Sequence, residues 1–361
     1  MGVLSGAFCI PESQFKALRS ANNRNVRGGF HLSEVYVNQN GALRARSRQN
    51  ISERAGLALL GAGEDGTVYI GHFASTKNDP VAIKIGNKRS LAIESKVMKA
   101  VEKLSPHVQH LYMYKTPEQC AFEATKRRGG NPLMNSLNKN FGIMYSEYAN
   151  GGSLEFFIKN YGKALTPAHI KTIVFQVLWT LHVIMSKYPT FRHCDLSLAN
   201  IFIDLTVPAR GRIEYKPGFS VPQVGIRAII GDFANSHINK KGFYNPSVKS
   251  GEHTNDFGIF NGMSSRYDAH LFLTQLGEFL REAPAAKEFL GFLKDCIPKK
   301  YMPTASGKSA QLVAQRLRPD SDAVKDIPPV FGMLKHPYFS EFRVEAMSGS
   351  VMYRWPRNNE V

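Results

Sequence analysis

Apolar residues follow two periodicities along the chain, and each predicts a different kind of element. Between residues 55 and 85, runs rich in β-branched residues alternate with glycines and an Asn-Asp-Pro turn, which predicts an antiparallel sheet. Residues 90–104 place apolar side chains at helical spacing and end before a Ser-Pro pair, which predicts one helix. Residues 141–148 predict a further strand.

The rest of the chain has a mainly helical pattern, which strand-like runs interrupt at residues 201–203 and 228–230. The most apolar window, residues 173–185, is broken by Gln176 and His182. It is shorter than the ~18 apolar residues that a membrane-spanning helix needs. We therefore expect a buried helix there and no transmembrane segment.

This order of elements predicts an α+β fold with two lobes. We expect a small antiparallel sheet lobe with one helix at residues 55–149 and a larger, mainly helical lobe at residues 150–345. The polar and basic residues 1–54 predict an arm or cap, residues 115–140 a long loop, and residues 346–361 a tail.

Composition narrows the class of protein. Of 361 residues, 43% are hydrophobic and 21% are charged, which suits a chain with a real core. The net charge of +17 favours acidic partners, such as nucleic acid, anionic lipid or an acidic protein, although a basic enzyme with a solvated surface has the same balance. Four cysteines without metal-like spacing indicate a reducing, intracellular setting.

A glycine-rich segment supplies the first candidate chemistry. Residues 61–68 match G-x-G-x-x-G-x-V, in which Gly61, Gly63 and Gly66 let a hairpin backbone come close to phosphates. A strand containing Val68 follows these glycines, whereas a dinucleotide-binding fingerprint would open a helix. The pattern therefore favours a nucleotide-phosphate loop.

Lys84 ends an apolar strand sixteen residues after that loop. On its own it could be a lysine whose ammonium reaches solvent from a buried stem. Beside the glycine loop, phosphate binding is favoured. A buried lysine needs an anionic partner, and Glu94 on the predicted helix is the first candidate, with Glu102 second. Either glutamate could instead be an exposed helix residue.

The strongest pattern is His-x-Asp-Leu-x-x-x-Asn at residues 193–200, followed by a strand. Asp195 can orient or accept the proton of an attacking hydroxyl, and Asn200 can bind a metal ion. A second apolar strand ends in Asp232, whose carboxylate can hold Mg²⁺ that bridges phosphates. Each residue alone could be a turn residue, but their joint order indicates phosphoryl transfer.

Together these residues resemble the eukaryotic-type protein kinase superfamily, from about Leu57 to Phe342. The resemblance implies a bilobal kinase-like fold that uses ATP and Mg²⁺ to phosphorylate protein hydroxyls. It implies that Asp195 is the catalytic base and that Asn200 and Asp232 are the metal ligands.

The resemblance also assigns residues outside these motifs. Residues 144–154 look like the strand and hinge against which adenine binds, with Glu147 and Ala149 as nucleotide contacts and Ser146 guarding the back pocket. Asp268 resembles the helix aspartate that braces the catalytic loop. Two further stretches, residues 318–319 and 333–339, resemble the closing helices of the large lobe.

Several positions depart from the family pattern. Cys194 replaces the usual Arg that answers a phosphate on the activation loop, which implies activity that does not depend on such phosphorylation. Ser197 stands where Ser/Thr kinases usually have Lys, Ala234 replaces the Gly of Asp-Phe-Gly, and no Ala-Pro-Glu triplet follows. Residues 205–227 look like an inserted hairpin, and this insertion is similar to kinases of large DNA viruses.

The sequence leaves several functions to compare. An active Ser/Thr protein kinase is favoured because every residue needed to position metal, phosphate and hydroxyl is present. Ser197, Ala234 and the missing triplet favour a pseudokinase scaffold instead. A kinase for small molecules fits the C-terminal resemblance less well, and a purely nucleic-acid-binding role rests on charge alone. We expect a monomer inside a host cell, in the cytoplasm or nucleus or packaged in a virion.

Overall fold

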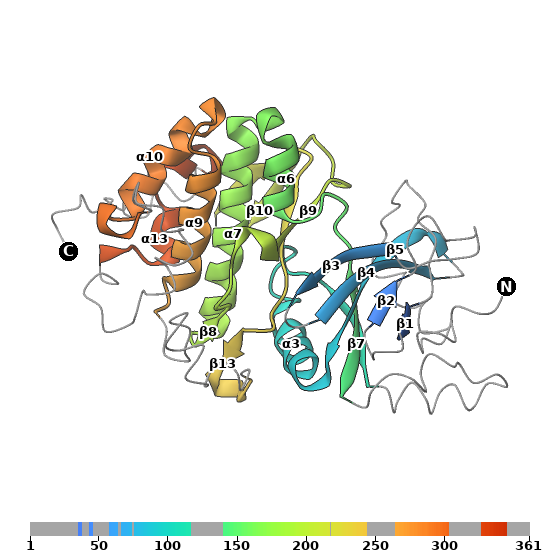
Figure 1. Cartoon of the computed structure of the whole chain (residues 1–361). Helices are drawn as coiled ribbons and strands as arrows, with labels where there is room; N and C mark the ends of the chain where they lie inside the picture. The colour runs from blue at the N-terminus through green and yellow to red at the C-terminus, as the bar shows by residue number, and fades with distance from the viewer. Residues whose placement is uncertain are drawn as a thin grey trace. The chain divides into compact units, whose positions relative to one another are not determined.

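A computed structural model describes much of the chain (Figure 1). It describes residues 35–37, 43–45, 58–63, 66–73, 76–116, 140–216, 218–243, 264–302 and 326–344. The predicted arm, apart from two short strands, lies outside these residues, as do the predicted tail, residues 318–319 and most of the predicted loop. The described residues form two compact units. The first unit contains the described residues up to Lys99 together with His110–Tyr148. The second unit contains Ala100–Gln109 together with the described residues from Ala149 onward.

The first unit contains a five-stranded antiparallel sheet. In spatial order its strands are β3 (Ala58–Gly63), β4 (Gly66–Phe73), β5 (Thr76–Asn87), β7 (Phe141–Glu147) and β6 (Leu111–Lys115). Two short strands, β1 (Val35–Val37) and β2 (Leu43–Ala45), pair separately. The predicted antiparallel sheet is confirmed.

Helix α3 (Lys88–Val101) follows β5 without a linker. Asn87 ends the strand and caps the helix, because its side-chain oxygen accepts hydrogen bonds from the backbone N–H groups of Arg89 (2.9 Å) and Ser90 (3.3 Å). The apolar residues that predicted this helix are buried, among them Val97 and Met98. The helix begins two residues earlier than its apolar pattern because the cap precedes the first apolar position.

The second unit is mainly helical. Its α-helices are α6 (Leu154–Tyr161), α7 (Pro167–Lys187), α9 (Tyr267–Phe279), α10 (Lys287–Cys296) and α13 (Val330–Leu334). Its 3₁₀ turns are η2 (Gly162–Ala164), η3 (Leu198–Asn200), η4 (Asn239–Lys241), η6 (Pro284–Ala286), η7 (Lys299–Tyr301) and η8 (Pro337–Phe342). The predicted α+β class, with a small sheet unit and a larger helical one, is confirmed.

Helix α7 is the central element of this unit. Thr166 caps it in a capping box with His169, and Pro167 supplies a fixed first turn. By length and composition α7 could cross a membrane, but 67% of its most apolar window is buried within the fold. Within the core, the Phe175 ring packs against other aromatic rings, those of Tyr215, Phe219, Phe339 and Phe342. The apolar surface of α7 is therefore explained by its position in the core of the second unit.

Three antiparallel strand pairs complete the second unit. They are β8 (Phe191–Arg192) with β13 (His237–Ile238), β9 (Ile201–Asp204) with β12 (Arg227–Ile230), and β10 (Arg212–Tyr215) with β11 (Phe219–Pro222). The β10–β11 pair is the hairpin that the sequence predicted within residues 205–227. It joins β9 to β12, so the insertion lies inside an existing ladder.

Buried polar contacts attach this hairpin to its unit. His107 joins the Tyr215 hydroxyl through Nε2 (2.8 Å) and the Ala228 carbonyl through Nδ1 (2.9 Å). Burial lowers the pKa of His107 to about 4, so the ring is neutral near pH 7. The side-chain oxygen of Gln176 on α7 accepts the Ala228 N–H at 2.8 Å. The hairpin therefore shares a polar network with α7 and with the segment that follows α3.

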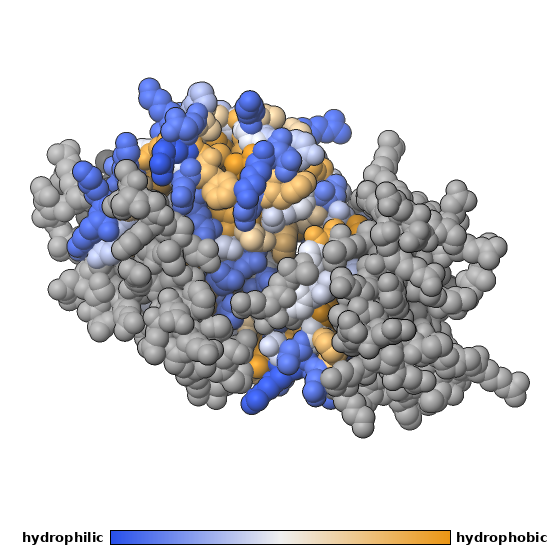
Figure 2. Space-filling model, viewed as in Figure 1, coloured by the Kyte–Doolittle hydropathy of each residue, from blue (hydrophilic) through white to orange (hydrophobic). Residues whose placement is uncertain are grey.

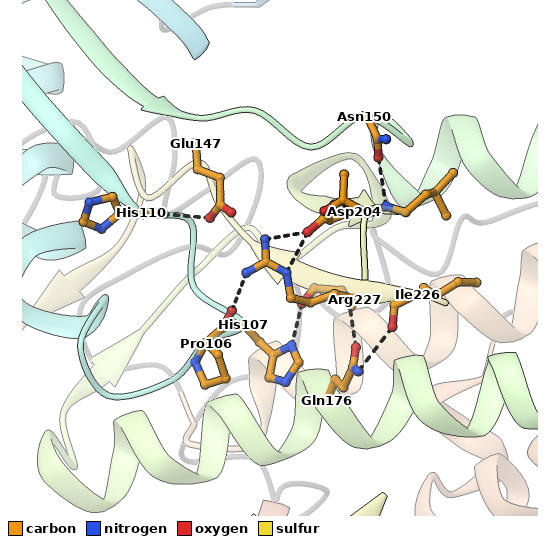
Figure 3. Close-up of polar contacts among 12 residues, drawn as sticks. Pro106, His107, His110, Glu147, Asn150, Gln176, Asp204, Ile226 and Arg227 are labelled. Atoms are coloured by element: carbon orange, nitrogen blue, oxygen red, sulfur yellow. Dashed lines mark hydrogen bonds and ion pairs between the residues drawn. The ribbon is translucent and has the colours of Figure 1, made fainter. Parts of the chain in front are cut away.

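An ion pair closes the base of the insertion, where Arg227 lies opposite Asp204 in the β9–β12 ladder. The Arg227 guanidinium donates from Nε at 3.0 Å and from Nη2 at 2.8 Å to Asp204 Oδ2, and its Nη1 donates to the Pro106 carbonyl at 2.9 Å (Figure 3). Both side chains are buried. Removing one partner of such a pair leaves the other charge uncompensated.

We expect Arg227→Ala to lower the free energy of unfolding by about 3–5 kcal/mol, because Asp204 is left buried without its cation. Urea denaturation measures the change. Lys159→Ala is the matched control, since Lys159 pairs with Glu155 on the exposed surface of α6 and should cost no more than about 0.5 kcal/mol. Equal effects of the two substitutions would contradict the structural role given to Arg227.

Candidate active site

Gly61 and Gly63 lie at the end of β3, and Gly66 begins β4. Gly63 pairs with Gly66, whose φ is +147° and whose hypothetical Cβ would lie 2.4 Å from the Ile85 carbonyl oxygen. Only glycine fits this position. At Gly61 an added Cβ would meet no atom within 4 Å, so packing does not require glycine there. An open backbone at Gly61 suits the predicted approach of a phosphate.

Strand register places Val68 directly opposite Lys84, and Lys84 opposite Met144. The Lys84 ammonium donates to Glu94 Oε2 at 3.0 Å, and both side chains are buried. The short separation of these two residues in sequence is explained by α3, which starts immediately after β5 and turns Glu94 back toward the strand. Glu94, the first of the two candidates, is thus the partner of Lys84.

The predicted hinge residues lie at the end of β7 and just beyond it. The Glu147 backbone N–H donates to the His110 carbonyl at 2.9 Å, and its carboxylate accepts the His110 N–H at 3.3 Å. Ser146 is buried and lies opposite Ala82. Ala149 is buried in the second unit, where its carbonyl accepts the Gly152 N–H. Contacts of Glu147 and Ala149 with a nucleotide stay a prediction.

The catalytic motif occupies the segment from β8 through η3 to β9. The Asn200 side-chain nitrogen donates to the Asp195 backbone carbonyl at 2.8 Å and to its carboxylate at 2.9 Å. These bonds use the amide nitrogen of Asn200 and leave its side-chain oxygen as the atom that can bind a cation. The structure therefore places the predicted base and one predicted metal ligand in direct contact.

Asp232 is held next to Asn200 by strand pairing. Ile230 lies opposite Ile201 in the β9–β12 ladder, and the Gly231 N–H donates to the Asn200 carbonyl at 3.0 Å. Asp232 itself has a φ of +56°, a left-handed conformation that is unusual for a non-glycine residue. Such backbone strain often accompanies a functional site. The oxygen-rich set of Asn200 and Asp232 fits Mg²⁺, which takes few protein ligands and completes its shell with water and phosphate.

Asp268 on α9 braces the catalytic loop. Its carboxylate oxygens accept the backbone N–H groups of His193 (2.8 Å) and Cys194 (2.9 Å), and Cys194 has a φ of +66°. Burial raises the pKa of the Asp268 carboxyl, while the charge and backbone N–H of His193 oppose that rise. The strained turn before Asp195 is thus held by a buried acceptor.

Other residues hold the same loop, and sequence reasoning did not find them. The Gln275 side-chain oxygen accepts the Leu198 N–H at 3.0 Å, and the Ser236 hydroxyl donates to the His193 carbonyl at 3.1 Å. The Cys194 sulfur lies 3.4 Å from His237 Nδ1. These partners are 43 to 77 residues from the loop residues that they contact, so no local pattern indicates them.

Comparison with known proteins finds similarity in part of the chain. Residues 55–211 match the protein kinase domain family. Over these residues the chain is similar to protein kinases, and its motifs and α+β fold are consistent with a divergent protein-kinase-like protein. Its relatives include an Acanthamoeba polyphaga mimivirus protein named "Putative serine/threonine-protein kinase R400", which is 27% identical over 172 residues. That alignment covers 44% of this chain and 36% of the mimivirus protein, so the chain matches about a third of that protein's length.

We expect Asp268→Asn to loosen the catalytic loop, because an amide has one acceptor oxygen where the carboxylate uses two. Hydrogen exchange of a peptide covering residues 191–200 should accelerate, and the free energy of unfolding should fall by about 1–3 kcal/mol. Asp326→Asn, which changes an exposed partner of Lys300, is the control and should leave exchange in that peptide unchanged. Unchanged exchange in Asp268→Asn would refute the bracing role.

Proposed function

We propose that the protein transfers the γ-phosphate of ATP to Ser or Thr hydroxyls of protein substrates with Mg²⁺ as cofactor. The observation that carries the proposal is the cluster of Asp195, Asn200 and Asp232, held by the β9–β12 ladder and by Asp268. This arrangement supports the proposal because phosphoryl transfer needs a base and metal ligands close together, and these three residues are the ones assigned to those roles.

In the proposed reaction, the substrate hydroxyl oxygen attacks the γ-phosphorus, and the bond to the oxygen that bridges the β- and γ-phosphates breaks. Asp195 orients the hydroxyl and accepts its proton, which leaves a phosphoester and ADP. Asn200 and Asp232 would hold Mg²⁺, and the bound ion would neutralise charge on the phosphates. Lys84, oriented by Glu94, binds phosphate oxygens, and the turn at Gly61, Gly63 and Gly66 supplies backbone N–H groups.

The departures from the family pattern bear on regulation. Cys194 occupies the position of the usual Arg, and its side chain is buried beside His237. Burial raises the pKa of the Cys194 thiol well above its ordinary value, so this position carries no charge that could answer a phosphate. We therefore infer that activity does not require phosphorylation of the activation segment.

The alternative is a pseudokinase scaffold. Ala234 is buried, and a methyl group there removes the backbone freedom of the usual glycine. Ser197 is nearly buried and its N–H donates to the Asp195 carbonyl, so it offers no cation where Ser/Thr kinases have Lys. These two residues are the observations that favour a protein that binds nucleotide without turnover.

The biological setting is part of the proposal. Similarity to a mimivirus protein supports a viral origin. We infer action on proteins inside an infected cell, in the cytoplasm or nucleus or packaged in a virion, and a monomeric enzyme. The name of that relative also supports the choice of Ser/Thr hydroxyls over tyrosine.

We expect Asp195→Asn to abolish phosphate transfer while nucleotide affinity stays within about twofold, because Asp195 acts on the hydroxyl and not on ATP. Radiolabelled γ-phosphate transfer from Mg·ATP to the protein itself and to generic basic and acidic proteins measures activity, and phosphoamino-acid analysis identifies the acceptor. Lys84→Met is the comparison variant and should impair phosphate placement. Full turnover by Asp195→Asn would disprove the assignment, and ATP binding without transfer by the wild type would establish the scaffold.

A further inference from the structure

One face of α3 carries only positive charge. Arg89, Lys96 and Lys99 are exposed and project from the side of the helix opposite its buried residues. With helical spacing of 100° per residue, these three positions share one side and span about 15 Å of the helix axis. Figure 2 shows hydrophilic side chains gathered over α3, near the lower edge of the view. We call these three residues the α3 basic face.

Among the described residues, the α3 basic face forms no ion pair with a carboxylate, although Glu102 lies three positions after Lys99, just beyond the end of α3. Exposed lysines elsewhere do have such partners, for example Lys159 with Glu155. The one acidic residue of α3, Glu94, is buried and bound to Lys84. Nothing on the helix therefore offsets the charge of the α3 basic face.

The positions of Arg89 and Lys96 oppose the stability of the helix, whereas Lys99 lies in the last turn, where the helix dipole favours a cation. Arg89 lies in the first turn, where the helix dipole favours acidic residues, and α3 has none there. Lys96 and Lys99 are three residues apart, so they repel each other across one turn. A local conflict of this kind indicates a functional demand on the surface. A bound polyanion would relieve it.

From this surface we propose that the α3 basic face binds the phosphate backbone of nucleic acid without reading sequence. A protein partner would need an apolar centre with aromatic anchors. Between the cations the helix instead offers Ala92 and Ile93, both half-buried, and no aromatic residue. Backbone phosphates need charge alone, and duplex DNA presents one charge per about 1.7 Å of axis, so several lie within reach of this face.

A membrane surface is the less favoured anionic partner. A helix that lies in a membrane interface inserts its apolar face. The apolar face of α3, with Leu91, Val97 and Met98, is buried in its own unit. The proposal is independent of catalysis, because none of the α3 basic face residues touches the residues assigned to phosphate transfer.

The test compares two triple variants of the full chain. R89A/K96A/K99A removes the α3 basic face, and K187A/R281A/K294A removes the same charge from exposed positions elsewhere in the second unit. Fluorescence anisotropy with a short labelled DNA duplex gives the binding constant over a range of salt concentrations. Removing three phosphate contacts should lower the slope of log K against log salt by about 2.7 and weaken binding more than about tenfold at 0.1 M salt.

The control triple variant should keep most of the slope, and Asp195→Asn should bind DNA as the wild type does. An equal loss in both triple variants would show that net charge alone acts, which overturns the assignment to α3. Absence of duplex binding by the wild type overturns the proposal outright. Binding that depends on the α3 basic face but is tighter to polyglutamate, or to vesicles containing phosphatidylserine, would assign the surface to an acidic protein or a membrane instead.

Discussion

A buried carboxylate sets the geometry on which the catalytic residues depend. Asp268 is removed from water, yet it accepts two backbone N–H groups from the turn that precedes Asp195. Because an unsatisfied acceptor in that environment is costly, the turn and α9 hold each other in place. The Asn200 side chain then donates to Asp195, and the Asn200 carbonyl accepts the N–H of Gly231, the residue before Asp232. Helix α9 thereby helps to hold the backbone of Asp195, Asn200 and Asp232 in one arrangement.

Helix α3 has a comparable dual role in the first unit. Its inner side presents Glu94 to Lys84, and its outer side carries the α3 basic face. Both depend on the same local event, the direct passage from β5 into the helix at the Asn87 cap. An anion that binds the outer side would contact α3, the helix whose Glu94 orients Lys84. The proposed surface interaction and the predicted phosphate-binding lysine therefore depend on the same helix.

Periodicity and local motifs were sufficient to predict most of the described elements and the candidate chemistry. The sheet, α3 and the inserted hairpin follow from patterns within short stretches, and Asp195 with Asn200 lies within a single motif. The contacts that hold the site in place were harder to predict from the sequence. The role of Asp268 came from resemblance alone, and the contact of His107 with Tyr215 joins residues 108 positions apart. Gln176 was visible only as a polar break in an apolar helix, because a sequence does not show which distant group satisfies it.

The hairpin between β9 and β12 packs into the core of the second unit. An insertion whose ends lie opposite each other could be deleted without changing the strand register around it, and Asp204 and Arg227 meet that condition. Yet Tyr215 packs against Phe175 and Trp179, and its hydroxyl bonds to His107. Excision would preserve the path of the chain but open a void in the core beneath it. The segment interrupts the β9–β12 ladder along the chain, yet its side chains form part of the core of the unit.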